Sequence, residues 1–338
     1  MTAGDQGPPF SIFSGGGLCD GRLFLADPRQ STVHQIDLAD GHRVRALGTA
    51  GNDLGSLKSP ETAIPDCDQG VVHVIDARGI VSFDLNTGAF IRRLPRAHSV
   101  GVALGPGLLD QGFLILPALH FATMDNFEMG STALRGASLG YRQHASKEDE
   151  GSPMLGLLTE HCRSASPCTR VGIDRIRTSP SGWLGCQGAG HEVGIFGDDG
   201  QLRSRIDIRS PQFQDDGTTV RGSEPATRAI EWSQRNSSVI WCGAFKGVIA
   251  TAHYTFEAGT WSPGFAMTPK VRLNIHRVDG TPVVADLALR DQPIARDESF
   301  IYVPVFGSGR NNPDNRTMEL DRIRMIEGAD LNPKLLQR

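Results

Sequence analysis

Residues 19–48 read CDGRLFLADPRQSTVHQIDLADGHRVRALG, and residues 67–95 repeat the same pattern as CDQGVVHVIDARGIVSFDLNTGAFIRRLP. Each stretch opens on Cys-Asp and continues as a short apolar segment that ends in Asp27 or Asp76. An alternating segment, an Asp-Gly or Thr-Gly turn and a basic, apolar segment follow. Alternation at period two indicates strands with one buried face, and the glycine turns are typical of hairpins. The repeated unit is therefore a small antiparallel sheet.

The first strand of this unit recurs six times along the chain. The six copies open at Leu23, Val71, Phe113, Trp183, Val239 and Phe300. The residues before the first copy and those after the last copy together have about the length of one more unit. This is expected if the two ends of the chain complete one blade and close the ring, since closure removes exposed sheet edges. We therefore predict an all-β fold, a six-bladed β-propeller with about four antiparallel strands per blade, closed by both termini. Residues 1–338 are expected to form this one domain.

Ring closure and two prolines give more local expectations. We expect residues 10–13 to pair into the sheet that contains residues 320–326, or to lie beside it. Pro117 and Pro304 fall late in two of the repeated strands, where proline removes a ladder hydrogen bond, so these strands should stop or bulge there. A β-sandwich with coincidental spacing is the alternative fold.

The repeat resembles that of six-bladed propellers of the NHL-repeat type. The resemblance rests on the strand-ending Asp residues, on GQLRSRIDI from Gly200 and on GSLKSPETAIPD from Gly55. Lactonase-like and strictosidine-synthase-like propellers are more distantly similar, and that similarity implies a Ca²⁺ ion at the channel mouth. The inner strands of this chain offer carboxylates but no matching asparagines. NHL-type propellers include enzymes, sensors and interaction modules, so the resemblance implies a fold and no single function.

Two long insertions interrupt the repeat, at about residues 119–170 and 246–270. The first contains a helix signal over residues 152–162, with a serine cap and a proline in the first turn. Cys162 and Cys168 close a short loop that could hold a disulfide or two free thiols. The second insertion is aromatic, which fits a binding loop and buried packing equally well.

The innermost strands of a propeller line its channel, and we place them about nine residues before each repeated strand. The positions so identified are Glu61, Thr62, His98, Asp174, Arg175, Arg177, Arg228, Glu231 and Asp291. Six of them are predicted to bind ligand: Glu61, His98, Asp174, Arg175, Arg228 and Glu231. Burying charges is costly unless they are paired or bind something, so they predict a polar funnel for a small polar ligand, a peptide or a protein. Inter-blade ion pairs such as Asp174–Arg228 are the alternative.

A second function remains open, that of a small-molecule hydrolase, lyase or cyclase that uses carboxylates and histidine at the channel mouth. A divalent metal could assist, and Ca²⁺ is the candidate because the available ligands are oxygens. No catalytic residue and no metal ligand is assigned. Of the ten histidines only His98 lies on a predicted inner strand, whereas a zinc lyase would need three. No GxSxG elbow is present.

Charge and hydropathy exclude some partners. The 34 basic and 38 acidic residues give a net charge of −4, which does not favour nucleic acid. No run of 18 apolar residues occurs, so no membrane span is predicted. The opening MTAGDQGPPF lacks the basic start and apolar core of a signal peptide, which predicts a cytoplasmic protein unless a signal has been removed. Six cysteines do not decide the compartment.

Overall fold

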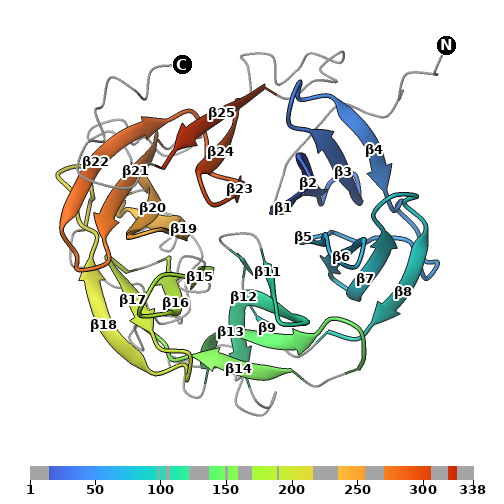
Figure 1. Cartoon of the computed structure of the whole chain (residues 1–338), viewed down its shortest axis with the longest axis horizontal. Coiled ribbons are helices and arrows are strands. Elements are labelled where there is room, and N and C mark those ends of the chain that lie inside the picture. Colours follow the sequence, from blue (N-terminus) through green and yellow to red (C-terminus); the bar gives the residue numbers. More distant parts are fainter. Residues whose placement is uncertain are drawn as a thin grey trace.

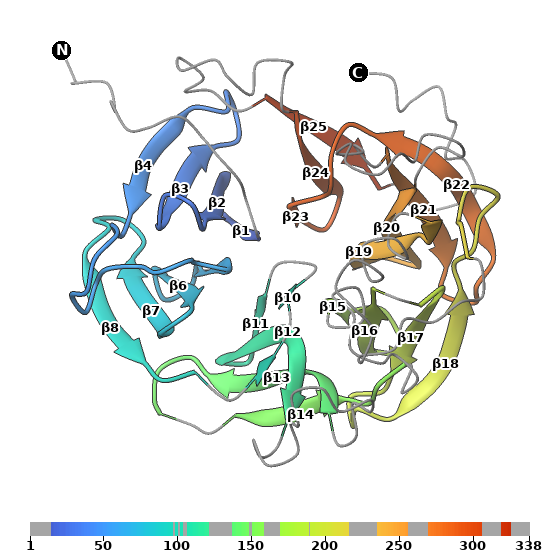
Figure 2. The same ribbon diagram turned by 180° about the vertical axis from the view of Figure 1, so that it is seen from behind.

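A computed structural model describes residues 15–96, 99–100, 102–103, 107–121, 137–148, 151–158, 170–188, 190–215, 235–255, 270–305 and 319–325. In these parts of the chain the strands form six separate sheets. The sheets stand around a common centre like the blades of a propeller, in chain order (Figure 1), and the view from behind shows the same ring (Figure 2). The predicted six-bladed all-β propeller is confirmed.

The strands of the first three blades follow the repeat closely. Blade one contains β1 (Gly16–Cys19), β2 (Arg22–Asp27), β3 (Thr32–Asp37) and β4 (Arg43–Leu47). Blade two contains β5 (Thr62–Asp66), β6 (Val71–Asp76), β7 (Gly79–Asp84) and β8 (Phe90–Leu94). Blade three contains β11 (Leu108–Asp110), β12 (Phe113–Phe121), β13 (Ala137–His144) and β14 (Ser152–Leu155), with the short β9 (Ser99–Val100) paired to β12.

The other three blades complete the ring. Blade four contains β15 (Arg170–Ile176), β16 (Gly182–Gln187), β17 (Glu192–Phe196) and β18 (Leu202–Asp207), and β10 (Val102–Ala103) adds to β15 in parallel. Blade five contains β19 (Ser238–Phe245), β20 (Val248–Thr255), β21 (Lys270–Arg277) and β22 (Pro282–Leu289). Blade six contains, among the described residues, β23 (Ala295–Arg296), β24 (Phe300–Val305) and β25 (Glu319–Arg324). Apart from β10, the paired strands are antiparallel.

The repeated strands occupy equivalent places in five of the blades. They are β2, β6, β12, β16 and β24, each the second strand in the antiparallel path of its sheet, with β10 of blade four left out because it pairs with β15 in parallel. In blade five the repeated strand is β19, the first of the described strands. The predicted turns also form, because Gly41, Gly88, Gly200 and Gly280 all have positive φ, a conformation that glycine adopts without penalty.

Pro117 interrupts its strand in the expected way. The pairing of β12 with β13 shifts register between Leu116 and Leu119, which confirms a bulge at this proline. The bulge follows from the hydrogen bond that proline cannot donate. At Pro304 no bulge forms, because Pro304 pairs with Leu320 and Val305 with Glu319 in regular register. The residues after Val305 lie outside the described part of the chain.

The predicted helix over residues 152–162 is wrong at its start. Ser152–Leu155 forms β14, the outermost strand of blade three, which pairs with β13. The side chain of Leu155 is buried against Leu139 and Phe196, and this packing outweighs the local helix signal. Pro153 is tolerated because the far edge of an outermost strand needs no ladder bond.

Apolar clusters fill the spaces between neighbouring blades, and one of them closes the ring. Leu23 and Leu25 of blade one pack in the same cluster as Ile294, Ala295 and Tyr302 of blade six. The first and last blades of the chain are thus in direct contact. The expected strand over residues 10–13 lies outside the described residues. No described segment forms a helix long and apolar enough to cross a bilayer.

Two disulfides join consecutive blades. Cys19 is bonded to Cys67 with their Cα atoms 5.7 Å apart, and Cys186 to Cys242 with Cα atoms 6.5 Å apart. The partners are 48 and 56 residues apart, which equals the spacing of the repeated strands in those blades. Each disulfide therefore joins two cysteines that are separated by one repeat of the sequence. Cys162 and Cys168 lie outside the described residues.

Candidate functional site

A cavity of about 720 Å³ lies where blades four, five and six meet. Its walls come from the β15–β16 turn, the β19–β20 hairpin, the β23–β24 turn and the residue after β25. The lining residues are Arg175, Arg177, Thr178, Ser179, Ala244, Phe245, Lys246, Val248, Arg296, Glu298, Ser299 and Met325. Each of the first three segments follows the first strand in the antiparallel path of its blade, β15, β19 or β23, so the repeat itself brings these turns together.

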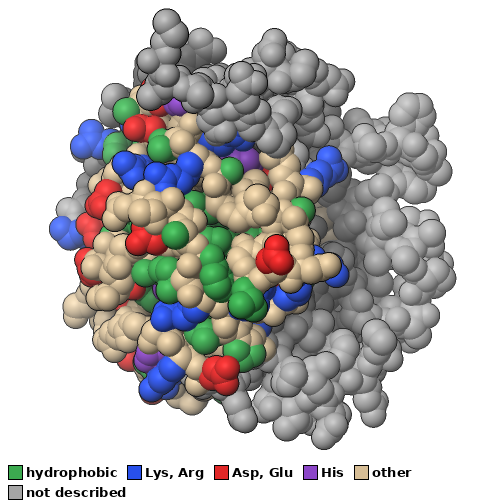
Figure 3. All heavy atoms as spheres, turned by 90° about the vertical axis from the view of Figure 1, so that its right-hand side faces the viewer, with side chains coloured by type: hydrophobic (Ala, Val, Ile, Leu, Met, Phe, Trp, Pro, Cys, Tyr) green, Lys and Arg blue, Asp and Glu red, His purple; other side chains and the backbone are tan. Residues whose placement is uncertain are grey.

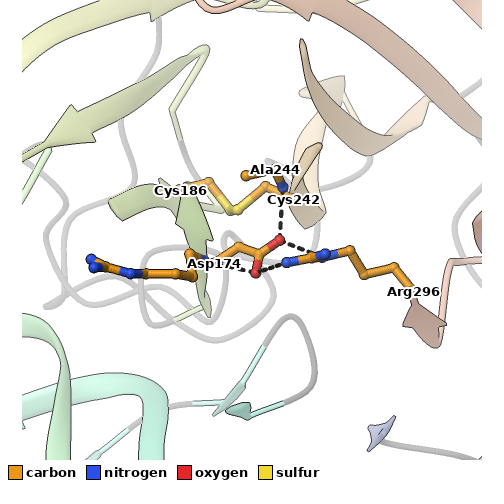
Figure 4. The surroundings of a disulfide bond; sticks show 6 residues. Asp174, Cys186, Cys242, Ala244 and Arg296 are labelled. Atoms are coloured by element: carbon orange, nitrogen blue, oxygen red, sulfur yellow. Dashed lines mark hydrogen bonds and ion pairs between the residues drawn. A yellow bond between two sulfur atoms is a disulfide. The ribbon is translucent and has the colours of Figure 1, made fainter. Parts of the chain in front are cut away.

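Asp174 and Arg296 form a buried ion pair beside this cavity. The guanidinium of Arg296 donates through Nη2 to Oδ1 of Asp174 and through Nε to Oδ2, at 2.6 Å for the latter pair. The backbone N–H of Ala244 also donates to Oδ2 at 2.7 Å, and that of Arg175 to Oδ1 at 2.8 Å. Figure 4 shows this carboxylate between the two partners, next to the Cys186–Cys242 disulfide. One carboxylate thus connects blades four, five and six.

Arg296 keeps its charge despite its burial. Only 17% of its side chain and 8% of that of Asp174 are exposed. Burial alone would lower the pKa of Arg296, but the charge and hydrogen bonds of Asp174 raise it above its ordinary value. The guanidinium also lies 5.4 Å from the centre of the Phe245 ring, a cation–π distance. A fixed cation therefore stands in the cavity wall.

The side chain of Arg175 is held by Trp183 and Asp198, two residues of the same blade. Its guanidinium lies 4.6 Å from the centre of the Trp183 ring and pairs with Asp198. Ser181 donates to Asp198 at 2.7 Å, and the hydrogen bonds from Ser181 and then Arg175 lower the pKa of this carboxyl. Trp183 and Asp198 together fix the direction of the Arg175 side chain.

Arg177 and Glu298 are looser parts of the wall. Nη1 of Arg177 and Oε1 of Glu298 are 3.4 Å apart, and the side chains are 68% and 83% exposed. Such an exposed pair contributes little to stability and separates easily. Lys246 is exposed in the β19–β20 hairpin and lines the same cavity. The wall therefore holds four basic side chains and one acidic side chain.

Glu61 lies in a different part of the ring. It precedes β5 in blade two, and its Oε1 accepts a hydrogen bond from Nη1 of Arg96 at 2.7 Å. Arg96 also donates to the hydroxyl of Tyr141 at 3.1 Å. Burial alone would lower the pKa of Arg96, but Tyr141 and Glu61 raise it. Glu61 is thus paired with an arginine that follows β8 of blade two and also contacts β13 of blade three.

The structure brings three of the predicted inner-strand residues to the cavity and places Glu61, Thr62 and Asp291 outside its lining. Asp174, Arg175 and Arg177 lie at the cavity or directly beside it. Thr62 is buried in blade two, where its Oγ1 accepts from the N–H of Gly107 at 3.3 Å. Asp291 precedes β23 and accepts from the N–H of Gln292 at 2.7 Å. His98, Arg228 and Glu231 lie outside the described residues.

Sequence reasoning missed Lys246, Arg296 and Glu298. In blade four the inner carboxylate Asp174 stands nine residues before Trp183, as the spacing rule assumes. In blade six the inner strand β23 is two residues long, and Arg296 stands only four residues before Phe300. In blade six, a position four residues before the repeated strand would have identified Arg296. The ion-pair alternative named Arg228 as the partner of Asp174, whereas the partner in the structure is Arg296.

The described residues do not fit a calcium site at the channel mouth. Both oxygens of Asp174 accept hydrogen bonds from Arg296 and the backbone, and Glu61 is paired with Arg96. Within the described ranges, the one group of three close potential metal ligands is Cys19, Asp20 and Cys67, and its two cysteines are joined as a disulfide. Calcium needs several converging free oxygens, which these groups do not offer.

Some apolar side chains are exposed on the outer strands of blades one and two. They are Val44 of β4, Phe90 and Ile91 of β8, and Leu54 in the loop before β5. Figure 3 shows this side of the ring, where hydrophobic side chains gather among charged ones. Exposed apolar residues are common on monomeric proteins, so they do not by themselves indicate a function.

No protein-family model matches the sequence, and a comparison with curated proteins found no match. Among solved structures, a member of the DUF4221 family from Bacteroides vulgatus is similar with a TM-score of 0.62 at 11% identity, over 96% of this chain and 95% of that one. A putative exported protein from Bacteroides fragilis has a TM-score of 0.56 at 10% identity, over 97% and 94%. Hydrazine synthase of Kuenenia stuttgartiensis has a TM-score of 0.50 at 13% identity, over 91% and 77%. Identities this low show a shared propeller fold and nothing about activity.

Proposed function

We propose that the protein is a ligand-binding propeller of the NHL-repeat type whose site is the cavity between blades four, five and six. The observation that carries the proposal is the set of charged side chains that three separate turns bring to one concave site. A volume of about 720 Å³ lies within the range of small-molecule pockets, which runs from about 300 to 1,000 Å³. The cavity therefore fits a small polar ligand better than it fits a peptide or the surface of a protein.

Contacts within the protein hold two arginines of the cavity wall in place. Asp174 orients Arg296 through two hydrogen bonds, and Trp183 and Asp198 orient Arg175. Side chains fixed in this way lose little conformational entropy when a ligand binds. This arrangement supports binding by groups whose positions the propeller determines.

The alternative of a hydrolase, lyase or cyclase has less support at this site. General acid–base chemistry needs a carboxylate, a histidine or another titratable group close to the reacting atoms. Among the described residues that line the cavity, Glu298 is the single carboxylate, and none is histidine. Glu298 is 83% exposed and pairs with Arg177, and no second carboxylate among these lining residues stands beside it to share acid–base work.

Filling the cavity should abolish ligand binding. We expect Thr178→Trp, which adds an indole to a half-buried lining position, to weaken binding at least tenfold by exclusion of the ligand. The matched control is Thr281→Trp, at an exposed position of the β21–β22 turn away from the cavity. Binding is measured by ligand-observed NMR with a library of small metabolites, first against the unmodified protein. Equal binding by both variants and the unmodified protein would place the site elsewhere.

A further inference from the structure

Both disulfides cross a boundary between consecutive blades. Cys19 of β1 is bonded to Cys67, which follows β5, and Cys186 of β16 is bonded to Cys242 of β19. Their Cα atoms are 5.7 and 6.5 Å apart, within the usual disulfide range of about 4.4–6.8 Å. Every cysteine in the described part of the chain belongs to one of these two bonds. Two separate boundaries of the ring therefore carry the same kind of link.

The Cys186–Cys242 bond occupies space that the neighbouring strand leaves open. Gly172 of β15 is directly opposite Cys186 in the register of β15 and β16. A Cβ atom at this glycine would lie 2.6 Å from Sγ of Cys186 and 2.9 Å from Sγ of Cys242, closer than real Cβ contacts allow. The glycine therefore makes room for both sulfurs at once, which supports a bond that is part of the fold.

The two bonds differ in their access to solvent. Cys186 is fully buried and Cys242 is 5% exposed. In the other pair Cys19 is 3% exposed, but Cys67 is exposed in the turn after β5. Thiol–disulfide exchange begins when an external thiolate reaches one sulfur of the bond, so its rate depends on access. The folded protein should therefore exchange the first bond and protect the second.

A metal site is the alternative use of Cys19 and Cys67. Together with Asp20 they form a group of three close potential ligands among the described residues. Zinc binds cysteine as the free thiolate, and its structural sites have four protein ligands. A cysteine pair cannot be a disulfide and hold zinc through two thiolates at the same time. The state of these two sulfurs therefore distinguishes the two alternatives.

We propose that the protein acquires both disulfides in an oxidising compartment, where Cys186–Cys242 forms during folding and Cys19–Cys67 stays open to exchange in the folded protein. Disulfides persist in oxidising environments and are rare where thiol buffers keep cysteines reduced. In each bond two thiols lose two electrons and two protons to a disulfide oxidant of the compartment, which becomes a dithiol. Burial of Cys186 and Cys242 closes this route once blades four and five have packed together. This inference is independent of the ligand of the cavity.

Thiol trapping in the cells that make the protein tests the compartment. Cells are quenched with acid, and their proteins are alkylated with N-ethylmaleimide under denaturing conditions. Trypsin then separates the six cysteines into six peptides, because a lysine or arginine stands between each two of them. We expect two linked peptide pairs in the mass spectrum, Cys19 with Cys67 and Cys186 with Cys242. Maleimide on all four cysteines, or a bound metal ion with Cys19 and Cys67 unlinked, would overturn the inference.

Reduction of the folded protein tests the difference between the bonds. One thiolate of dithiothreitol attacks Sγ of Cys67 and releases the Cys19 thiolate. The second thiolate of the reagent then releases Cys67, so two protein thiols form and the reagent becomes a cyclic disulfide. Samples are alkylated at successive times and mapped by mass spectrometry. We expect Cys19 and Cys67 to react at least about tenfold faster than the buried pair, whose bond is reached only by local unfolding.

Denaturant and matched variants supply the controls. In denaturant the two bonds should be reduced at about the same rate, because the structure that protects the second bond is gone. In the folded protein, the variant Cys19→Ala, Cys67→Ala should lose the fast reaction and keep the slow one. The variant Cys186→Ala, Cys242→Ala should do the reverse. Equal rates for the two bonds in the folded protein, or faster reduction of the buried one, would overturn the inference.

Discussion

Asp174→Ala is expected to lower the free energy of unfolding by about 3–5 kcal/mol, because it leaves the buried Arg296 cation without its partner. The backbone N–H groups of Ala244 and Arg175 lose their acceptor in the same step. Both effects act where three blades meet, so the cavity wall should lose its order and ligand binding should fall with stability. Urea unfolding curves and a binding isotherm of the same preparation measure the two losses.

Two further variants test whether the loss of stability comes from the unpaired buried Arg296 or would follow the removal of any carboxylate. Asp198→Ala removes an exposed carboxylate that also pairs with an arginine, and its unfolding curve should stay close to that of the unmodified protein. Asp174→Leu combined with Arg296→Met replaces the whole ion pair with apolar groups and should recover much of the stability. An Asp174→Ala protein as stable as the Asp198→Ala protein would show that the buried pair is not important for folding.

Removal of the Cys186–Cys242 disulfide is expected to destabilise the protein by about 4 kcal/mol, because it closes a loop of 56 residues and restricts the unfolded chain. The double variant Cys186→Ala, Cys242→Ala should also bind ligand more weakly. Ala244, which follows Cys242 by two residues, lines the cavity and holds Asp174. Chemical denaturation and ligand titration of the oxidised protein and the double variant provide the measurement.

The second disulfide supplies the control for this prediction. Cys19 and Cys67 join blades one and two across 48 residues, away from the cavity. The variant Cys19→Ala, Cys67→Ala should lose a similar amount of stability and keep its ligand affinity. If both double variants bind ligand equally well, the disulfide beside Asp174 has no part in the organisation of the site.

The fold could be predicted from the sequence because each blade is encoded locally. The apolar strands, their terminal aspartates and the glycine turns recur in order, and the carboxylate of Asp27 accepts from the backbone N–H groups of the turn that follows it. The local helix signal at Ser152–Leu155 was misleading because it ignores tertiary pairing. There the exposed edge of β13 and the buried position of Leu155 decide the conformation.

The site could be predicted only in part, because it is assembled from residues far apart in the chain. Asp174 and Arg296 are 122 residues apart, and nothing in either local sequence names the other as its partner. Charge at the inner strands was visible in the sequence, and of the residues that it marked, Asp174, Arg175 and Arg177 lie at the cavity or beside it. Their part in ligand binding stays a prediction. The cavity depends on how three turns meet, which is set by the angles between the blades. The periodicity of the strands does not predict these angles.

A crystal structure of the protein with the small polar ligand that it binds most tightly is the sharpest test of the proposed site. We expect electron density for this ligand in the cavity between blades four, five and six, in contact with Phe245 and Arg296. Density at the centre of the ring beside Glu61, or at the outer strands of blades one and two, with the cavity empty, would contradict it.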